Sequence, residues 1–404
     1  MGIRGLPKLI KDIAGSYAIR SYPFSKFRGM TIAVDANLLI YQSAIALRST
    51  GKDMKNKSGE LTSHLHGLFY KVLIFLQNNI VPIFVFDGKA PNIKNKILEK
   101  RIQNSFDAEN QMSKIDSLED GKYIKYFRKA FRLTKENIKE AQILLDLMGI
   151  PYIIAPGEAD VVCSWLATRC GPDGKRYVKG VCSDDSDMLA FGSPYLFKNM
   201  LRSMGKNGKV EVISLHNTLV KMNLTMDQFI DLCVLLGSDY CDNIKKIGPK
   251  TSFKLITKIG SLEKVLDYLL KGKPSEKYEK ECMIEARNYF KNALKELDES
   301  DNFVLTDDNL KLKKFQYKEL VDFMCIKHNF DIVKIQNGIR RLEKYYKKMD
   351  VSRENVKKVH QILHPRFDNC IIRSSLEDII SFNGEILVKR KKSDCTKSKF
   401  LGSR

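Results

Sequence analysis

Val81-Pro82-Ile83-Phe84-Val85-Phe86 runs directly into Asp87, and this segment is the clearest indication of the fold. It is short, continuously apolar and rich in branched and aromatic side chains, which is typical of a strand buried on both faces of a sheet. A second run of this kind, Thr31–Val34, ends at Asp35, and Val178–Ser183 is a third strand candidate.

Helical patterns alternate with these strands. Apolar residues recur at three- and four-residue spacing over Leu38–Leu47 and Leu61–Gln77, and Thr134 is a suitable N-cap for an amphipathic helix over Thr134–Met148. Further helical patterns cover residues 158–167, 226–236 and most of 274–347. Strands that alternate with helices predict an α/β fold with a central, mostly parallel sheet flanked by helices.

Acidic residues stand beside the apolar segments, where ordinary surface charges are not expected. There are seven of them: Asp35, Asp87, Glu158, Asp160, Asp185, Asp187 and Asp239. Ligands of open parallel sheets bind beyond the carboxyl ends of the strands, so we expect these side chains to meet at that edge. Any single one is more simply explained as a helix cap or a loop residue. Together they predict a site for two Mg²⁺ ions, which prefer oxygen ligands and, as a pair, promote phosphodiester hydrolysis.

The bulk composition is strongly basic. The 404 residues include 69 Lys and Arg against 48 Asp and Glu, a formal charge of +21. This excess favours a polyanionic partner, either nucleic acid or an acidic membrane surface, although solubility alone is a simpler explanation. The nine scattered cysteines are typical of reduced thiols in an intracellular protein. We expect no membrane span, because no apolar stretch is long enough.

Several basic and aromatic positions are candidates for nucleic-acid contacts. Lys94 and Arg101 are two helical turns apart, so they share one face that either holds a phosphate or is simply solvated. Gly248 and Lys250 lie in a Gly-Pro turn between two helical patterns, as in a helix–hairpin–helix, whose turn amides contact DNA phosphate. Tyr41 either stacks on a base or belongs to the core.

Seven motifs together resemble the flap endonucleases of the structure-specific 5′-nuclease superfamily. The resemblance runs from residue 1 to about residue 342. The motifs are Met1-Gly2-Ile3-Arg4-Gly5-Leu6, Ala33-Val34-Asp35-Ala36, Ser63-His64-Leu65-His66-Gly67-Leu68-Phe69-Tyr70, Val85-Phe86-Asp87-Gly88-Lys89, Met148-Gly149-Ile150-Pro151-Tyr152, Ala155-Pro156-Gly157-Glu158-Ala159-Asp160 and Leu235-Leu236-Gly237-Ser238-Asp239-Tyr240-Cys241.

The resemblance implies a Mg²⁺-dependent hydrolase that removes 5′ flaps at single-strand/double-strand junctions of branched DNA in replication and repair, with Mn²⁺ as a substitute ion. It implies that the seven acids bind two metal ions and that Lys94 and Arg101 are catalytic. The expected DNA contacts are Gly2, Tyr41, Arg48, Gly248 and Lys250, with K⁺ as a further ion at the helix–hairpin–helix.

The same resemblance implies a domain organisation. We expect a 5′-nuclease domain over residues 1–347, with a helical arch at about 90–133 and the helix–hairpin–helix at about 236–260. Residues 348–404 are expected to form a basic, flexible tail. The expected protein is a monomer.

Three departures from the family pattern affect these expectations. Asp160 stands where flap endonucleases usually have Glu, and a shorter side chain shifts a metal ion or admits a water. The acidic stretch at Asn56–Glu60 keeps only Glu60, which affects how a flap is ordered. The C-terminal box that binds a sliding clamp is missing, since Arg373–Ile380 has a similar rhythm without its Gln or aromatics. The sequence therefore leaves open whether the protein binds a sliding clamp.

Two rival functions remain. One is a gap-directed 5′ exonuclease or junction resolvase of the same superfamily; the match over Ser63–Tyr70 and the short arch favour the flap enzyme. The other is a non-catalytic DNA-structure-binding protein, against which the complete acid set with Lys94 and Arg101 argues. Lys389–Lys392 indicates either nuclear import or a DNA-binding tail. We expect an intracellular protein located in the nucleus.

Overall fold

The computed structural model describes residues 2–115, 121–171, 173–202, 208–271, 276–301, 303–305 and 307–359. Met1–Tyr346 forms one compact unit, and the chain from Lys347 onward forms a second. The segments behind the nuclear and clamp-binding expectations, Arg373–Ile380 and Lys389–Lys392, lie outside the described residues. In the described part of the chain, no helix is both long enough and apolar enough to cross a bilayer.

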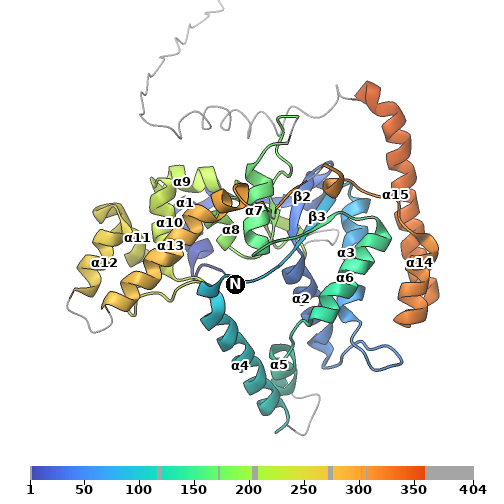
Figure 1. Cartoon of the computed structure of the whole chain (residues 1–404), viewed down its shortest axis with the longest axis horizontal. Helices are drawn as coiled ribbons and strands as arrows, with labels where there is room; N and C mark the ends of the chain where they lie inside the picture. Colours follow the sequence, from blue (N-terminus) through green and yellow to red (C-terminus); the bar gives the residue numbers. More distant parts are fainter. Residues whose placement is uncertain are drawn as a thin grey trace, which may run out of the picture. The chain divides into compact units, whose positions relative to one another are not determined.

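A single sheet is the centre of the unit (Figure 1). The described strands are β1 (Ile19–Pro23), β2 (Thr31–Asp35), β3 (Val81–Phe86), β4 (Tyr152–Ile154), β5 (Val181–Cys182), β6 (Tyr195–Lys198) and β7 (Lys209–Ser214). Their order is β1-β7-β6-β5-β2-β3-β4. The strands from β6 to β4 are parallel, whereas β7 and β1 extend the sheet antiparallel at one edge. The mostly parallel sheet is confirmed; the antiparallel edge was not predicted.

Helices surround the sheet. The described α-helices are α1 (Leu6–Ala18), α2 (Ala36–Leu47), α3 (Ser63–Gln77), α4 (Asn95–Met112), α5 (Gly121–Lys129), α6 (Lys135–Met148), α7 (Ala159–Thr168), α8 (Asp187–Ala190), α9 (Leu215–Met222), α10 (Met226–Leu236), α11 (Pro249–Ile259), α12 (Leu262–Leu270), α13 (Glu276–Asp298), α14 (Tyr317–Val321) and α15 (Ile332–Val359). The cap predicted at Thr134 is confirmed: its hydroxyl accepts the Asn137 N–H at 3.2 Å, and the Asn137 side chain accepts the Thr134 N–H at 3.2 Å.

The strands alternate their side chains between two apolar layers, as period-two geometry requires. Ala33, Ile83 and Val85 belong to the core that they share with α1, α7 and α10. Ile32 and Phe84 are equally buried but point to the opposite face, which α2 and α3 cover, with α6 packed against α3 (Figure 1). A sheet covered on both faces explains why β2 and β3 read as uninterrupted apolar runs.

The strand register brings four strand ends to one edge. Val34 of β2 pairs with Phe84 on one side and with Cys182 on the other, and Phe86 of β3 pairs with Ile154 of β4. The parallel strands β5, β2, β3 and β4 are therefore neighbours whose carboxyl ends open on the same side. The predicted third strand exists, but as the two residues of β5 only.

Two helical pairs lie beside this core. Helix α4, of which only Ser105 and Ala108 are buried, packs against α5, and α5 packs against the 3₁₀ turn η2 (Arg48–Thr50) at the end of α2. Helices α10 and α11 pack together across the turn that ends at Gly248. These are the elements expected to form the arch and the helix–hairpin–helix.

Gly67 provides a test of how closely α2 and α3 pack. A Cβ at this position would lie 2.2 Å from the Ser43 Cβ. Alanine favours a helix over glycine by about 1 kcal/mol, but overpacking costs about 1–3 kcal/mol. We expect Gly67→Ala to lower the free energy of unfolding, measured by urea denaturation.

Gly121→Ala is the matched control, because nothing lies within 4 Å of the added Cβ at the start of α5. We expect it to be neutral or slightly stabilising. A Gly67→Ala protein as stable as the Gly121→Ala protein would contradict the close packing of α2 on α3.

Candidate functional site

The acids of the four neighbouring strands sit where a strand passes into a helix. Asp35 ends β2 and caps α2, with its Oδ1 accepting the Leu38 N–H at 2.9 Å. Glu158 is the N-cap residue of α7, and Asp160 lies in the first turn of that helix. Asp187 begins α8. Helix N-termini attract negative charge, which explains how buried carboxylates are tolerated there.

Asp87 joins two of these elements. Its Oδ2 accepts a hydrogen bond from the Asn37 side chain of α2 at 2.7 Å, and its Oδ1 accepts the Ala159 N–H of α7 at 2.9 Å. The next residue, Gly88, makes this approach feasible: a Cβ there would lie 1.9 Å from the Ala155 carbonyl oxygen. The end of β3 is thereby held against the turn that carries Glu158.

The pair after β5 lies against the start of the chain. Asp185 Oδ1 accepts the Asp187 N–H at 3.0 Å, and Asp187 Oδ1 is buried without a hydrogen-bond partner. Gly2 has a left-handed φ of 80°, and a Cβ on it would lie 2.0 Å from Asp185 Oδ1. Gly2, one of the expected DNA contacts, therefore lies beside the acids, at a place that requires a residue with no side chain.

Lys94 stands among all seven acids. Its ammonium donates to Glu158 Oε1 and lies 4.0 Å from Asp239 Oδ2. Its charge also acts on Asp35, Asp87, Asp160, Asp185 and Asp187. Arg101, further along α4, donates to the same Asp239 oxygen. The two cations that the spacing placed on one face therefore both reach the acidic cluster, and the remaining acid, Asp239, comes from the loop between α10 and α11.

Crowding of buried carboxylates raises the pKa values of the acids and of the lysine among them, which favours neutral acids and a charged lysine. Burial and the charge of Asp87 raise the pKa of Asp35 to about 8. Burial also raises the pKa of Asp185, and burial together with the Asp185 charge raises that of Asp187 well above its usual range. Burial alone would lower the pKa of Lys94, but the charges of Glu158 and Asp160 outweigh it and raise that pKa. At neutral pH, the cluster therefore holds too little positive charge to balance its carboxylates.

The donors of this cluster fit a hard divalent cation, because all are carboxylate oxygens and one, Asp187 Oδ1, has no partner. Within the described residues, no three His, Cys, Asp or Glu side chains are already arranged so that they could hold a metal ion. Most of the carboxylates have other partners in this structure: Glu158 accepts from Lys94, Asp239 accepts from Arg101, and Asp35, Asp87 and Asp185 accept from backbone N–H groups. Metal binding would require some of these side chains to rotate inward.

One participant was missed from the sequence. Tyr289 of α13 donates its hydroxyl to Glu158 Oε2 at 3.2 Å, and Tyr240 donates to the same oxygen. Burial and the Glu158 charge raise the pKa of both hydroxyls, so both remain donors. Tyr240 belongs to a quoted motif, but Tyr289 lies in a long charged helix whose pattern gives no sign of this contact.

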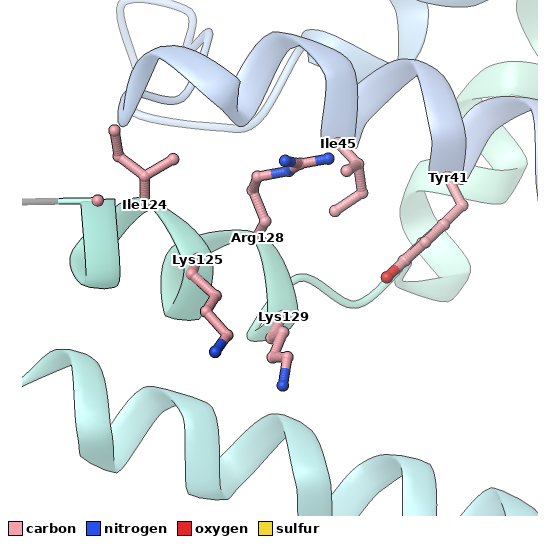
Figure 2. Close-up of a pocket in the computed structure, with 7 residues that line it drawn as sticks. Tyr41, Ile45, Ile124, Lys125, Arg128 and Lys129 are labelled. Carbon is pink, nitrogen blue, oxygen red and sulfur yellow. The ribbon is translucent and has the colours of Figure 1, made fainter.

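Tyr41 lines an open pocket of about 380 Å³ between α2 and α5, so it is not a core residue. In Figure 2, Tyr41 and Ile45 point from α2 toward α5, and Lys125 and Lys129 extend from α5 on the side away from α2. The pocket thus combines one accessible aromatic ring with positive charge, a combination suited to a single nucleic-acid strand.

Arg48, an expected DNA contact, is buried instead of facing solvent. Its guanidinium lies 3.7 Å from the ring centroid of Phe127 in α5 and 3.1 Å from Asp53. Arg48 therefore connects η2 to α5, one of the two helices that line the pocket of Tyr41.

Gly248 and Lys250, by contrast, are exposed, as are Lys245 and Lys246. Gly248 caps α11, and Pro249 is its first residue. The free N–H groups at the start of this eleven-residue helix, with the lysines beside them, are a suitable contact for a phosphate.

Comparisons with known proteins agree with this architecture. The XPG N-terminal domain family matches residues 1–108, and the XPG I-region matches residues 149–239. The chain is 40% identical over 349 residues to a flap endonuclease 1 of Nematostella vectensis, covering 85% of this chain and 88% of that protein.

Solved structures of the same kind superpose on the fold. The flap endonuclease-1 of Methanococcus jannaschii matches with a TM-score of 0.61 and 26% identity, over 83% of this chain and 98% of that one. The catalytic core of Rad2 in complex with a DNA substrate matches with a TM-score of 0.57 and 25% identity, over 84% and 99%. With 40% sequence identity to the Nematostella vectensis protein over 85% of its own length, the chain belongs to the flap endonuclease family.

Proposed function

We propose that this protein is a structure-specific 5′ flap endonuclease and 5′–3′ exonuclease that hydrolyses DNA phosphodiesters at single-strand/double-strand junctions. The observation that carries the proposal is the placement of acids at the carboxyl ends of the parallel strands β2, β3 and β5 and at the start of α7, with Lys94 donating to Glu158 and Arg101 donating to Asp239 beside them. Replication and repair are the processes in which such an activity acts on branched DNA.

The chemistry is divided between bound ions and side chains. Asp35, Asp87, Glu158, Asp160, Asp185, Asp187 and Asp239 are the residues that would hold two Mg²⁺ ions, or Mn²⁺ in their place. Such ions would activate water and neutralise charge at the phosphodiester.

Lys94 and Arg101 contribute the remaining positive charge. Both already contact acids of the cluster, at Glu158 and Asp239, so they stand where a phosphate bound at these acids would lie. They hold the scissile phosphate and stabilise the negative charge that develops on it.

The substrate is selected by its shape. The pocket of Tyr41, Lys125 and Lys129 receives the single strand, where the ring stacks on a base and the lysines face phosphates. Gly248 and Lys250 grip a phosphate of the duplex, with K⁺ as a candidate ion at that turn. Contacts to phosphate position DNA without reading its sequence.

A substrate panel tests the proposal. Purified protein with Mg²⁺ should cut a 5′-flapped duplex faster than a blunt duplex or a four-way junction. Preference for the four-way junction would identify a junction resolvase, and no Mg²⁺-dependent cutting of any flap would identify a non-catalytic binding protein. Flap affinity should fall steeply with salt, because phosphate contacts release counterions.

Asp185→Asn tests the acidic cluster. The change removes one negative charge at nearly constant volume, so we expect cutting to fall roughly 10²–10³-fold, while flap affinity is unchanged or slightly higher. Rates under single-turnover conditions and a binding assay in Ca²⁺ measure the two effects separately.

The matched control is the neighbouring Asp184→Asn. Asp184 accepts hydrogen bonds from Gln42 and the Asn199 N–H and pairs with Arg202, outside the cluster. The Asp184→Asn protein should cut a 5′-flapped duplex at nearly the wild-type rate. Equal losses in the two variants would contradict a specific role for Asp185.

The raised pKa values predict a pH dependence. A carboxyl whose pKa is raised on folding stabilises the fold below its unfolded value, near 4, and loses that contribution as pH rises through its folded value, about 8 for Asp35. Metal-free protein should therefore lose stability between about pH 5 and pH 8. Since ions bind deprotonated acids, the rise in melting temperature with Mg²⁺ should be larger at about pH 8 than at about pH 6.

Differential scanning fluorimetry at the two pH values measures this difference, and Asp185→Asn should reduce the Mg²⁺ effect. An effect that is equal at both pH values would show that the ions do not bind at the buried acids.

A further inference from the structure

Glu158 is the most completely hydrogen-bonded acid of the cluster. Its Oε2 accepts from the hydroxyls of Tyr240 and Tyr289, and its Oε1 accepts from Lys94. The residue is only 4% exposed. The neighbouring Asp187 Oδ1, by comparison, has no hydrogen-bond partner at all.

The number of lone pairs limits what this carboxylate can do. Each carboxylate oxygen accepts about two hydrogen bonds, so the two tyrosine hydroxyls together saturate Oε2. Only Oε1 is then left to face a cation, and Lys94 is the cation that it meets in this structure.

The Tyr289 ring is fixed independently of its hydroxyl. Its centroid lies 4.9 Å from that of Tyr240 and 5.8 Å, edge-on, from that of Phe191. Helix α13 is in turn tied to α7, which carries Glu158 at its start. Trp165 donates to Asp298 at 2.6 Å, and Arg169 pairs with the same carboxylate. The hydroxyl therefore reaches Glu158 from a rigid support.

We propose that Tyr289 is a positioning residue whose hydroxyl, with that of Tyr240, turns Glu158 so that only Oε1 can bind a divalent ion. This inference rests on the proposed function, since it takes Glu158 to be a metal ligand. Residues that orient metal ligands in this way affect metal affinity about 10–100-fold.

Tyr289→Phe removes the hydroxyl and keeps the ring contacts. We expect the Mn²⁺ affinity of the free protein, measured by titration calorimetry, to fall roughly tenfold. The Mg²⁺ concentration for half-maximal cutting should rise by a similar factor, while the rate at saturating Mg²⁺ stays within about threefold of wild type.

Tyr346→Phe is the matched control, since it also removes a hydroxyl from a half-buried tyrosine. That hydroxyl donates to the carbonyl oxygens of Met148 and Gly149, away from the acids. We expect this variant to keep the wild-type Mn²⁺ affinity even where its stability falls. Equal Mn²⁺ affinities for wild type and Tyr289→Phe would overturn the inference.

A double-mutant cycle with Glu158→Gln separates positioning from general packing. If Tyr289 acts through the Glu158 carboxylate, Tyr289→Phe should weaken Mn²⁺ binding no further in the Glu158→Gln background. A full additional loss would overturn the inference. Wild-type protein that binds no Mn²⁺ would instead refute the proposed function, and with it this extension.

Discussion

Repulsion among seven neighbouring carboxylates has to be balanced by the elements that pack around them. Strand ends, the start of α7 and the loop between α10 and α11 supply these acids, and burial together with the Asp87 charge raises the pKa of Asp35 to about 8. A cluster of this kind is stable only where opposing groups surround it. Lys94 in the middle, Arg101 on Asp239, and the starts of α2, α7 and α8 supply that opposing charge. The elements around the site therefore stabilise its negative charge as well as holding its side chains in place.

The cations of the site come from outside the sheet. Lys94 and Arg101 belong to the base and body of α4, the helix that packs on α5 and lines the approach to the acids. In the proposed function, α2 and α5 contact the single strand and the segment of Lys94 and Arg101 holds the phosphate. Because α4 packs on α5, a change in the position of α4 would then alter both contacts. Arg48, buried against Phe127, fixes the other side of this unit to α2.

Charge is distributed unevenly in the chain. The net charge of +21 belongs to the protein as a whole, whereas the cluster is the place where negative charge is concentrated. Lysines at the turn before α11 and on α5 are exposed, where they would attract the backbone of DNA in the proposed function. The acids would repel that backbone unless cations lie between them. Lys94 partly meets this need, and divalent ions would complete it.

Sequence pattern was enough to predict the parallel centre of the sheet, the acids that follow its strands, and the basic pair seven residues apart. These predictions depend on local periodicity and on the rule that parallel strands end at one edge. The antiparallel pairing of β1 and β7, the burial of Arg48 against Phe127, and the contact of Tyr289 with Glu158 became evident only in the folded protein. Residues 158 and 289 are joined by the packing of α13 on α7. Local pattern does not encode such a contact, because a tyrosine at a helical spacing looks the same whether its hydroxyl meets solvent or a carboxylate.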